Sequence, residues 1–211
     1  MDELVLQGQQ KWPNVPHAYG YLALSAQGHW HIYAAPHTTP DFSAQSRVTS
    51  PALQQFIARN YAVDASGCWY FQNGPQRAYV MLEKAPLILH LDEALQLRSH
   101  TQHAIDAISA WYITDTGELY AHSPAGCGLV IGRDVPALAE RLHLAEGASL
   151  LDYLEHHDPH ELHGVTLLYH NAKQEIPQSA MVYYTQDQGL PRLSGFVRLP
   201  APTPITDQSS L

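Results

Sequence analysis

The chain has 211 residues, of which 45% are apolar and only 15% are charged, and its formal net charge is −9. This composition excludes intrinsic disorder, whose signature is low hydrophobicity combined with dense charge. It also excludes a membrane-spanning helix, because no stretch approaches the roughly 18 consecutive apolar residues that such a helix needs. A chain of this length buries about 70% of its unfolded surface, in one large domain or two small ones.

The distribution of charge bears on the partners of the protein. Nucleic acids are bound by clustered lysines and arginines, whereas the three lysines here (Lys11, Lys84 and Lys173) lie far apart and the arginines are equally scattered. We therefore expect no nucleic-acid partner and no membrane partner. The 14 histidines titrate near pH 6.5, so mild acidification should move the net charge steeply toward zero.

The cysteines and the N-terminal residues favour a cytoplasmic location. Cys68 and Cys127 are too few for a disulfide framework, and neither belongs to a CxxC pair. The first residues are acidic, whereas a secretory signal peptide begins with positive charge and continues into an apolar segment. We expect two reduced thiols in a cytoplasmic protein.

In the first half, the opening fifteen residues are predicted to be irregular. Residues 19–24 and 29–33 alternate apolar and aromatic side chains around Gly28, which is typical of a β-hairpin. Ser50 is a helix N-cap and Pro51 the first helical residue. The buried stripe of this helix is predicted from apolar residues at helical spacing, namely Leu53, Phe56, Ile57 and Tyr61.

A second hairpin is predicted around Asn73-Gly74, because both central residues of a type I′ turn need positive φ and these two residue types tolerate it. Its strands are residues 68–72 and 75–82, with Pro75 at a strand start or at a sheet edge. Residues 87–91 and 94–97 are predicted as further short strands.

The second half is predicted from the same signals. A hairpin joins residues 110–114 and 118–121, and a glycine-containing loop at 124–128 precedes an apolar run at 129–131. One helix opens at Asp134 with Leu138 and Leu142 on one face, and Ser149 caps a second. The last predicted strands are 165–169, 181–185 and 196–199.

These elements predict an α+β fold of antiparallel hairpins packed against two or three short helices. The halves resemble each other: Gly28 corresponds to Gly117, Pro51-Ala52-Leu53 to Pro136-Ala137-Leu138, and Phe71 to Tyr169. Two interpretations stay open, an internal duplication or a chance similarity of two hairpin–helix–hairpin segments. The predicted organisation is an N-terminal lobe (1–104), a C-terminal lobe (105–199), which together could form one domain, and a disordered tail (200–211).

No catalytic or cofactor signature occurs, so candidate sites rest on local clusters. Zinc requires three or four converging ligands, and the candidates are His157, His160 and His163 in a histidine-rich segment. Asp158-Pro159 indicates a helix start there, which favours surface histidines over a metal site. Cys127 lies between two glycines, but no neighbour is identified that would activate its thiol. We therefore expect no cofactor and no metal.

The candidate binding surface is the second hairpin, which concentrates aromatic, amide and guanidinium groups within nine residues. Alternation places Trp69 and Phe71 on one face and Tyr70 and Gln72 on the other. Aromatic residues and arginine are enriched at contact surfaces, although an ordinary hairpin with one solvated face would give the same pattern. The candidate binding residues are Trp69, Tyr70, Gln72, Asn73, Gln76 and Arg77.

Residues 56–61, Asp64, Gly67 and residues 69–77 together resemble a family of uncharacterised proteobacterial proteins of about this length. The resemblance implies a bacterial origin and carries no activity or site residues. The sequence thus favours a non-enzymatic binding or interaction protein. The candidate partners are another protein, a second copy of the chain, or an anionic or amide-bearing small ligand of unknown identity. The alternative is a metal-assisted hydrolase that uses the histidines of residues 156–163.

Overall fold

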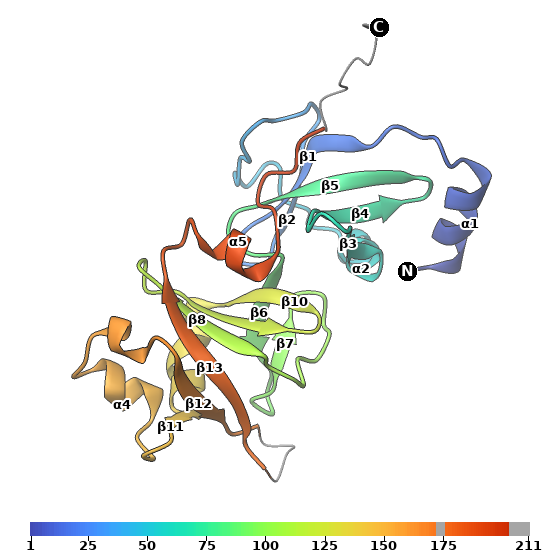
Figure 1. The fold of residues 1–211 in the computed structure, drawn as a ribbon. Coiled ribbons are helices and arrows are strands. Elements are labelled where there is room, and N and C mark those ends of the chain that lie inside the picture. Colours follow the sequence, from blue (N-terminus) through green and yellow to red (C-terminus); the bar gives the residue numbers. More distant parts are fainter. Residues whose placement is uncertain (172–175, 203–211) are drawn as a thin grey trace, which may run out of the picture.

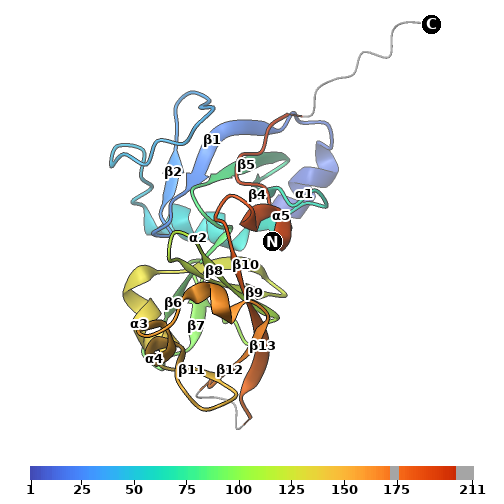
Figure 2. The ribbon, with the colours of Figure 1, turned by 60° about the vertical axis from the view of Figure 1, so that its left-hand side comes forward.

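The computed structural model describes residues 1–171 and 176–202 of the chain, whose strands form two sheets at opposite ends of the molecule (Figures 1 and 2). The first sheet has five strands in the order β2-β1-β5-β4-β3. Their bounds are β1 (Ala18–Leu24), β2 (Trp30–Ile32), β3 (Tyr61–Val63), β4 (Trp69–Asn73) and β5 (Gln76–Leu82).

The second sheet has eight strands in the order β11-β12-β13-β8-β9-β10-β6-β7. Their bounds are β6 (Leu87–Leu91), β7 (Leu97–Ser99), β8 (Ala110–Thr114), β9 (Leu119–Ser123), β10 (Gly126–Val130), β11 (Leu142–Leu144), β12 (Val165–Tyr169) and β13 (Gln178–Thr185). The sheets divide between β5 and β6, so β6 and β7, within the predicted lobe 1–104, pair inside the second sheet.

The helices are short, and α2, α4 and η2 begin at capping residues that the sequence identifies. The Ser50 and Ser149 side chains accept from the amides of Leu53 and Asp152, and Asp158 caps η2 in the same way. The helices are α1 (Glu3–Lys11), α2 (Pro51–Arg59), η1 (Gly132–Asp134), α3 (Val135–Ala139), α4 (Leu150–Leu154), η2 (Pro159–Leu162) and α5 (Leu190–Ser194). The predicted α+β class is confirmed. None of the helices in the described residues is long and apolar enough to cross a membrane.

The same order of strands occurs twice. The first sheet reads β2-β1-β5-β4-β3, and the second contains β9-β8-β13-β12-β11. In each set one pair of neighbours is parallel, β1 with β5 and β8 with β13, and the other neighbouring strands are antiparallel. Along the chain, α2 lies between β2 and β3, and α3 lies between β9 and β11. We call β1–β5 with α2 the first unit, and β8, β9 and β11–β13 with α3 the second unit. Duplication as their origin stays a prediction.

The hairpin turns of the two units have the same hydrogen bonds. In the first, Ser25 N donates to His29 O, Gly28 N to Ser25 O, and His29 N to the Ser25 hydroxyl. In the second, the same three bonds join Thr114, Gly117 and Glu118, each 89 positions later. Gly28 and Gly117 have φ of 81° and 79°, a left-handed conformation that favours glycine at this place.

Several predicted elements are wrong in detail. Residues 3–11 form α1, although an irregular segment was expected. Tyr61 and Leu142 do not continue the stripes of their helices, because α2 ends at Arg59 and α3 at Ala139 and both residues start edge strands. The strand expected at 94–97 lies at Leu97–Ser99, and residues 196–199 form no strand. The expected glycine loop at 124–128 is a turn followed by β10, which includes Cys127.

The second predicted hairpin forms, but its turn differs from the prediction. Asn73 ends β4 and pairs with Gln76, so the linking residues are Gly74 and Pro75. Only Gly74 has positive φ, at 56°, and the proline occupies the second position with its fixed negative φ. Because Pro75 is compatible with the second position, the two turn residues are Gly74 and Pro75, one residue later than the predicted Asn73 and Gly74.

The segment after α5 returns to the first sheet, where it passes close to β5 (Figure 1). Leu82 N donates to Arg198 O at 2.7 Å, and Val197 N donates to Gly67 O at 3.0 Å. Gly67 is required here, because its φ is +78° and a Cβ would lie 2.5 Å from Gly195 O. Most of the predicted tail, from residue 203 onward, lies outside the described residues.

Candidate functional site

The six candidate binding residues of the second hairpin do not form one site. Trp69 lines a mostly apolar pocket of 360 Å³ between the sheets, with its ring centroid 4.8 Å from that of Tyr61. Asn73 and Gln76 line a separate pocket of 350 Å³ beside the exposed Tyr21. The candidate surface is thus divided between different parts of the first unit.

The remaining three hairpin residues have partners within the hairpin. The Arg77 guanidinium lies 4.5 Å from the centre of the Tyr70 ring, which is a cation–π contact. Gln72 is fully buried, and its Nε2 donates to Gly74 O. In the described residues no carboxylate lies within ion-pair distance of Arg77. Glu83, the acidic neighbour considered as its partner, instead accepts from Ala26 N.

The histidine-rich segment places each of its candidate ligands against a tyrosine. His157 stacks on Tyr153 at 4.2 Å between ring centroids, His160 lies 3.7 Å from Tyr184, and His163 lies 5.5 Å from Tyr183. Within residues 1–171 and 176–202, no three histidine, cysteine or acidic side chains come together in a group that could hold a metal ion. The histidines therefore pack against aromatic rings in the described structure.

Cys127 lies within β10 and is 1% exposed. Burial raises the pKa of the Cys127 thiol to about 12, which keeps the thiol protonated near neutral pH. A protonated, inaccessible thiol is a poor nucleophile. Cys127 therefore has a packing role.

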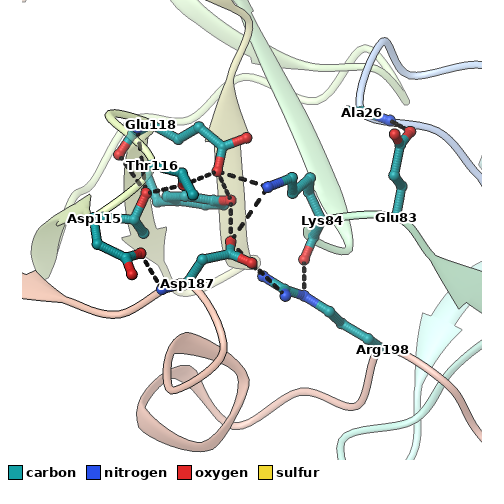
Figure 3. Close-up of polar contacts among 10 residues, drawn as sticks. Ala26, Glu83, Lys84, Asp115, Thr116, Glu118, Asp187 and Arg198 are labelled. Carbon is teal, nitrogen blue, oxygen red and sulfur yellow. Dashed lines mark hydrogen bonds and ion pairs between the residues drawn. The ribbon is translucent and has the colours of Figure 1, made fainter.

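Charged residues from distant segments meet where the two units join (Figure 3). Arg198 donates through both terminal nitrogens to Asp187, each at 2.8 Å, and Lys84 lies 2.9 Å from Glu118 and 3.5 Å from Asp187. The Tyr120 hydroxyl donates to both carboxylates. We call these five residues the junction cluster.

The junction cluster is balanced in charge and its groups have partners. Two cations face two carboxylates, and burial together with the neighbouring carboxylates raises the pKa of Tyr120. Arg198 Nε also donates to Lys84 O, which fixes the segment after α5 to the end of β5. Because every charge is paired internally, the cluster holds the two units together and offers no free group to a ligand.

A pocket with a volume of 510 Å³ lies over β8, β9 and β13. We call it the tyrosine pocket. The Tyr112 and Tyr183 rings lie 5.8 Å apart, and His163 packs against Tyr183 from the loop before β12. Its lining residues are Ser109, Ala110, Tyr112, His122, His163, Tyr183, Tyr184 and Leu193. Segments far apart in the sequence thus converge on one aromatic-lined cavity, the usual form of a ligand site.

The polar groups of the tyrosine pocket are neutral or histidine. Among the described lining residues, none is an aspartate, glutamate, lysine or arginine. Ser109 Oγ lies 3.0 Å from His122 Nδ1 and also donates to His122 O at 3.1 Å. Burial raises the pKa of Tyr112, which keeps its hydroxyl protonated.

Sequence reasoning missed the tyrosine pocket. Tyr112 and Tyr183 belong to strands that were predicted, but the pairing that joins them is parallel and links strands about 70 residues apart, as Tyr112 opposite Tyr183. Local hairpin signals cannot reveal such a pair. The spacing of 89 residues between the two hairpins is a signal that could have identified it. This spacing places Tyr112 and His122 at the positions of Ala23 and Tyr33, which pack together in the first unit.

Fold and pocket define an α+β protein of two sheets with an aromatic-lined cavity on the larger one. The chain belongs to the family DUF2944, described as "Protein of unknown function (DUF2946)", which matches residues 1–201. The expectation of an uncharacterised family is therefore confirmed. No protein of curated function matches the sequence.

Two solved structures are similar to this chain in part. A DUF1285 family protein from Silicibacter pomeroyi DSS-3 has 14% identity and a TM-score of 0.45, over 72% of this chain and 93% of that chain. A DUF1285 family protein from Shewanella baltica OS155 has 12% identity and a TM-score of 0.39, over 56% of this chain and 89% of that chain.

Proposed function

We propose that this protein is a non-enzymatic binding protein that holds a small uncharged molecule with an aromatic ring in the tyrosine pocket. One observation carries the proposal. The equivalent face of the first unit is covered by the chain itself, with the ring of Phe42 packed against it. The second unit leaves that position open to a ligand.

The equivalence of the two faces follows from strand register. In the first unit Ala23 lies opposite Met81 on the parallel neighbour, and in the second Tyr112 lies opposite Tyr183. Tyr33 N bonds to Tyr21 O in the first unit, and the corresponding pair in the second is His122 with Ala110. The cluster of Ala23, Tyr33 and Met81 therefore corresponds to Tyr112, His122 and Tyr183.

The two units differ in the segment that comes after the hairpin. After β2 the chain makes a long excursion, which brings Phe42 within 5.3 Å of the His31 ring and ties Asp41 O to the Tyr33 hydroxyl. After β9 the chain turns at once into β10, because Ser123 pairs directly with Gly126. No covering loop comes after β9 in the described residues, and the pocket is bordered by α5 through Leu193 and by the loop before β12 through His163.

The chemistry of the lining favours binding over catalysis. Tyrosine rings offer flat apolar surfaces and hydroxyl groups, which suit an aromatic ligand that also forms hydrogen bonds. None of the described lining residues is an aspartate, glutamate, lysine or arginine, so a molecule without a full charge is favoured. The two free thiols, Cys68 and Cys127, support a cytoplasmic location for the protein as part of this proposal.

Binding of 4-fluorophenol, followed by ¹⁹F NMR, tests the proposal. We expect saturable binding to the wild-type protein and about tenfold weaker binding to Tyr183→Ala, which removes one ring of the pocket. Tyr183→Phe keeps the ring and should bind within about threefold of wild type.

The control variant is Tyr21→Ala, which removes an exposed tyrosine of the first sheet outside the tyrosine pocket. It should leave the affinity unchanged, and cyclohexanol should compete poorly because it has no aromatic face. Equal losses in Tyr183→Ala and Tyr21→Ala would show that the probe binds tyrosines unspecifically, and the proposal would fail.

A further inference from the structure

A further cavity, of 420 Å³, lies where the first unit meets the segment after β7. The first unit contributes the turn at Gly28 and His29, together with Arg47 and one side of α2. The second sheet contributes His100 and Gln102. The two parts are close here, because a Cβ on Gly28 would lie 3.1 Å from the Cβ of His100. We call this cavity the junction pocket.

Arg47 supplies the formal charge of the junction pocket. In the described residues Arg59, Arg98 and Arg198 each have a carboxylate partner, whereas no carboxylate lies within ion-pair distance of Arg47. None of the described lining residues is acidic. Glu83, which reaches the same turn, uses its carboxylate to accept the Ala26 N–H at 2.6 Å. In a chain of net charge −9, this is a cavity with an available cation.

The two imidazoles of the junction pocket are neutral near pH 7. Burial lowers the pKa of His100 to about 3, and Ile88 N donates to its Nδ1, which places the remaining ring proton on Nε2. Burial, Arg47 and His31 lower the pKa of His29. The pocket therefore carries one positive charge surrounded by neutral hydrogen-bonding groups.

Glutamine amides supply further hydrogen-bonding capacity. Gln54 donates from Nε2 to Val48 O at 2.8 Å, which fixes its side chain and leaves its oxygen as an acceptor. Gln55 and Gln102 also line the cavity, and each amide offers two donors and an acceptor. One guanidinium with several amides is a donor set suited to a carboxylate or phosphate group that carries further polar atoms.

We propose that the junction pocket binds a small organic anion, through one carboxylate or phosphate group held by Arg47, and that this ligand contacts both the first unit and the second sheet. The site is independent of the tyrosine pocket, since the two cavities share no lining residue. The ligand adds contacts between two parts of the chain that the junction cluster already joins.

Titration of ¹⁵N-labelled protein with benzoate and with inorganic phosphate, at constant ionic strength, tests this site. For at least one of the two probes we expect saturable shifts of the amide signals of Gly28 and Gln102, which lie on opposite sides of the cavity. Arg47→Gln should bind that probe at least about tenfold more weakly, because it loses a charge-assisted hydrogen bond. Arg47→Lys keeps the positive charge but lacks the planar guanidinium, so its affinity for the probe should lie between those of wild type and Arg47→Gln.

The matched control is Arg133→Gln, which removes the same charge from a side chain that is 73% exposed and outside the cavity. It should leave the affinity within about twofold of wild type. The proposal is overturned if neither probe gives saturable shifts, if shifts are confined to one side of the cavity, or if Arg133→Gln weakens binding as much as Arg47→Gln. Comparison of benzoate with phosphate assigns the preferred oxyanion.

Discussion

Asp187→Ala is expected to lower the free energy of unfolding by about 2–3 kcal/mol, because it leaves partly buried cations without their partner. The Asp187 carboxylate accepts two hydrogen bonds from Arg198, and it also contacts Lys84 and the Tyr120 hydroxyl. Only 20% of the Arg198 side chain is exposed, so water compensates incompletely for the loss. Urea unfolding followed by circular dichroism measures the change.

The pH dependence distinguishes a lost ion pair from a general loss of packing. Burial opposes ionisation of Asp187, but Arg198 and Lys84 outweigh it and hold the pKa of the carboxyl below its usual value. A depressed native pKa stabilises the fold above the unfolded pKa of about 3.9, and this contribution is lost as pH falls through the native pKa. The difference in the free energy of unfolding between wild type and Asp187→Ala should therefore shrink below about pH 4.

Glu140→Ala provides the control for loss of a negative charge, because Glu140 is exposed at the end of α3. Its effect should stay within about 0.5 kcal/mol. If Asp187→Ala were no more destabilising than Glu140→Ala at pH 7, the junction cluster would not hold the two units together.

Trp111→Ala is expected to cost about 3–5 kcal/mol, since it removes the largest fully buried side chain of the second sheet. The Trp111 ring packs edge-on against Tyr169, with 5.7 Å between ring centroids. Truncation at this position leaves a cavity that neighbouring strands, fixed by their hydrogen bonds, cannot close. Urea unfolding measures this loss, and an unchanged slope would show that the unfolded state is the same.

Trp111→Phe should lower the free energy of unfolding much less than Trp111→Ala, by less than about 2 kcal/mol. In the described structure, Trp111 Nε1 is buried without a hydrogen-bond partner, so phenylalanine removes an unsatisfied donor together with some volume. Trp12→Ala is the control, because Trp12 is 52% exposed and its loss should cost less than about 1 kcal/mol. Equal costs for Trp111→Ala and Trp12→Ala would contradict the core position of Trp111.

Local signals in the sequence predicted the hairpins and helix starts well. Ser50-Pro51 and Ser149 cap helices as expected, and Gly28 and Gly117 form equivalent turns. The same signals located the ends of helices poorly. Tyr61 continues the apolar spacing of α2, but it begins an edge strand opposite Phe71, because tertiary pairing outweighs helical periodicity there.

The candidate site depended on information that local patterns do not contain. Tyr112 and Tyr183 share a pocket through parallel pairing, and Arg47 and Gln102 line one cavity between the first unit and the segment after β7. The hairpin of residues 69–77 is distinctive in composition, yet its side chains do not converge: Gln72 is buried, and Trp69 and Asn73 line two separate pockets. Composition identifies side chains suited to binding, whereas the convergence of distant strands decides which of them reach a cavity.

The return of the chain after α5 has a consequence for synthesis. Val197 and Arg198 bond to Gly67 and Leu82, so the first sheet receives these contacts from residues that are synthesised after the second unit. Domains generally fold as units in the order in which they are made. Here the first sheet is made before the second unit but receives two of its hydrogen bonds only after that unit has been made, so its final form depends on the synthesis of residues 197 and 198.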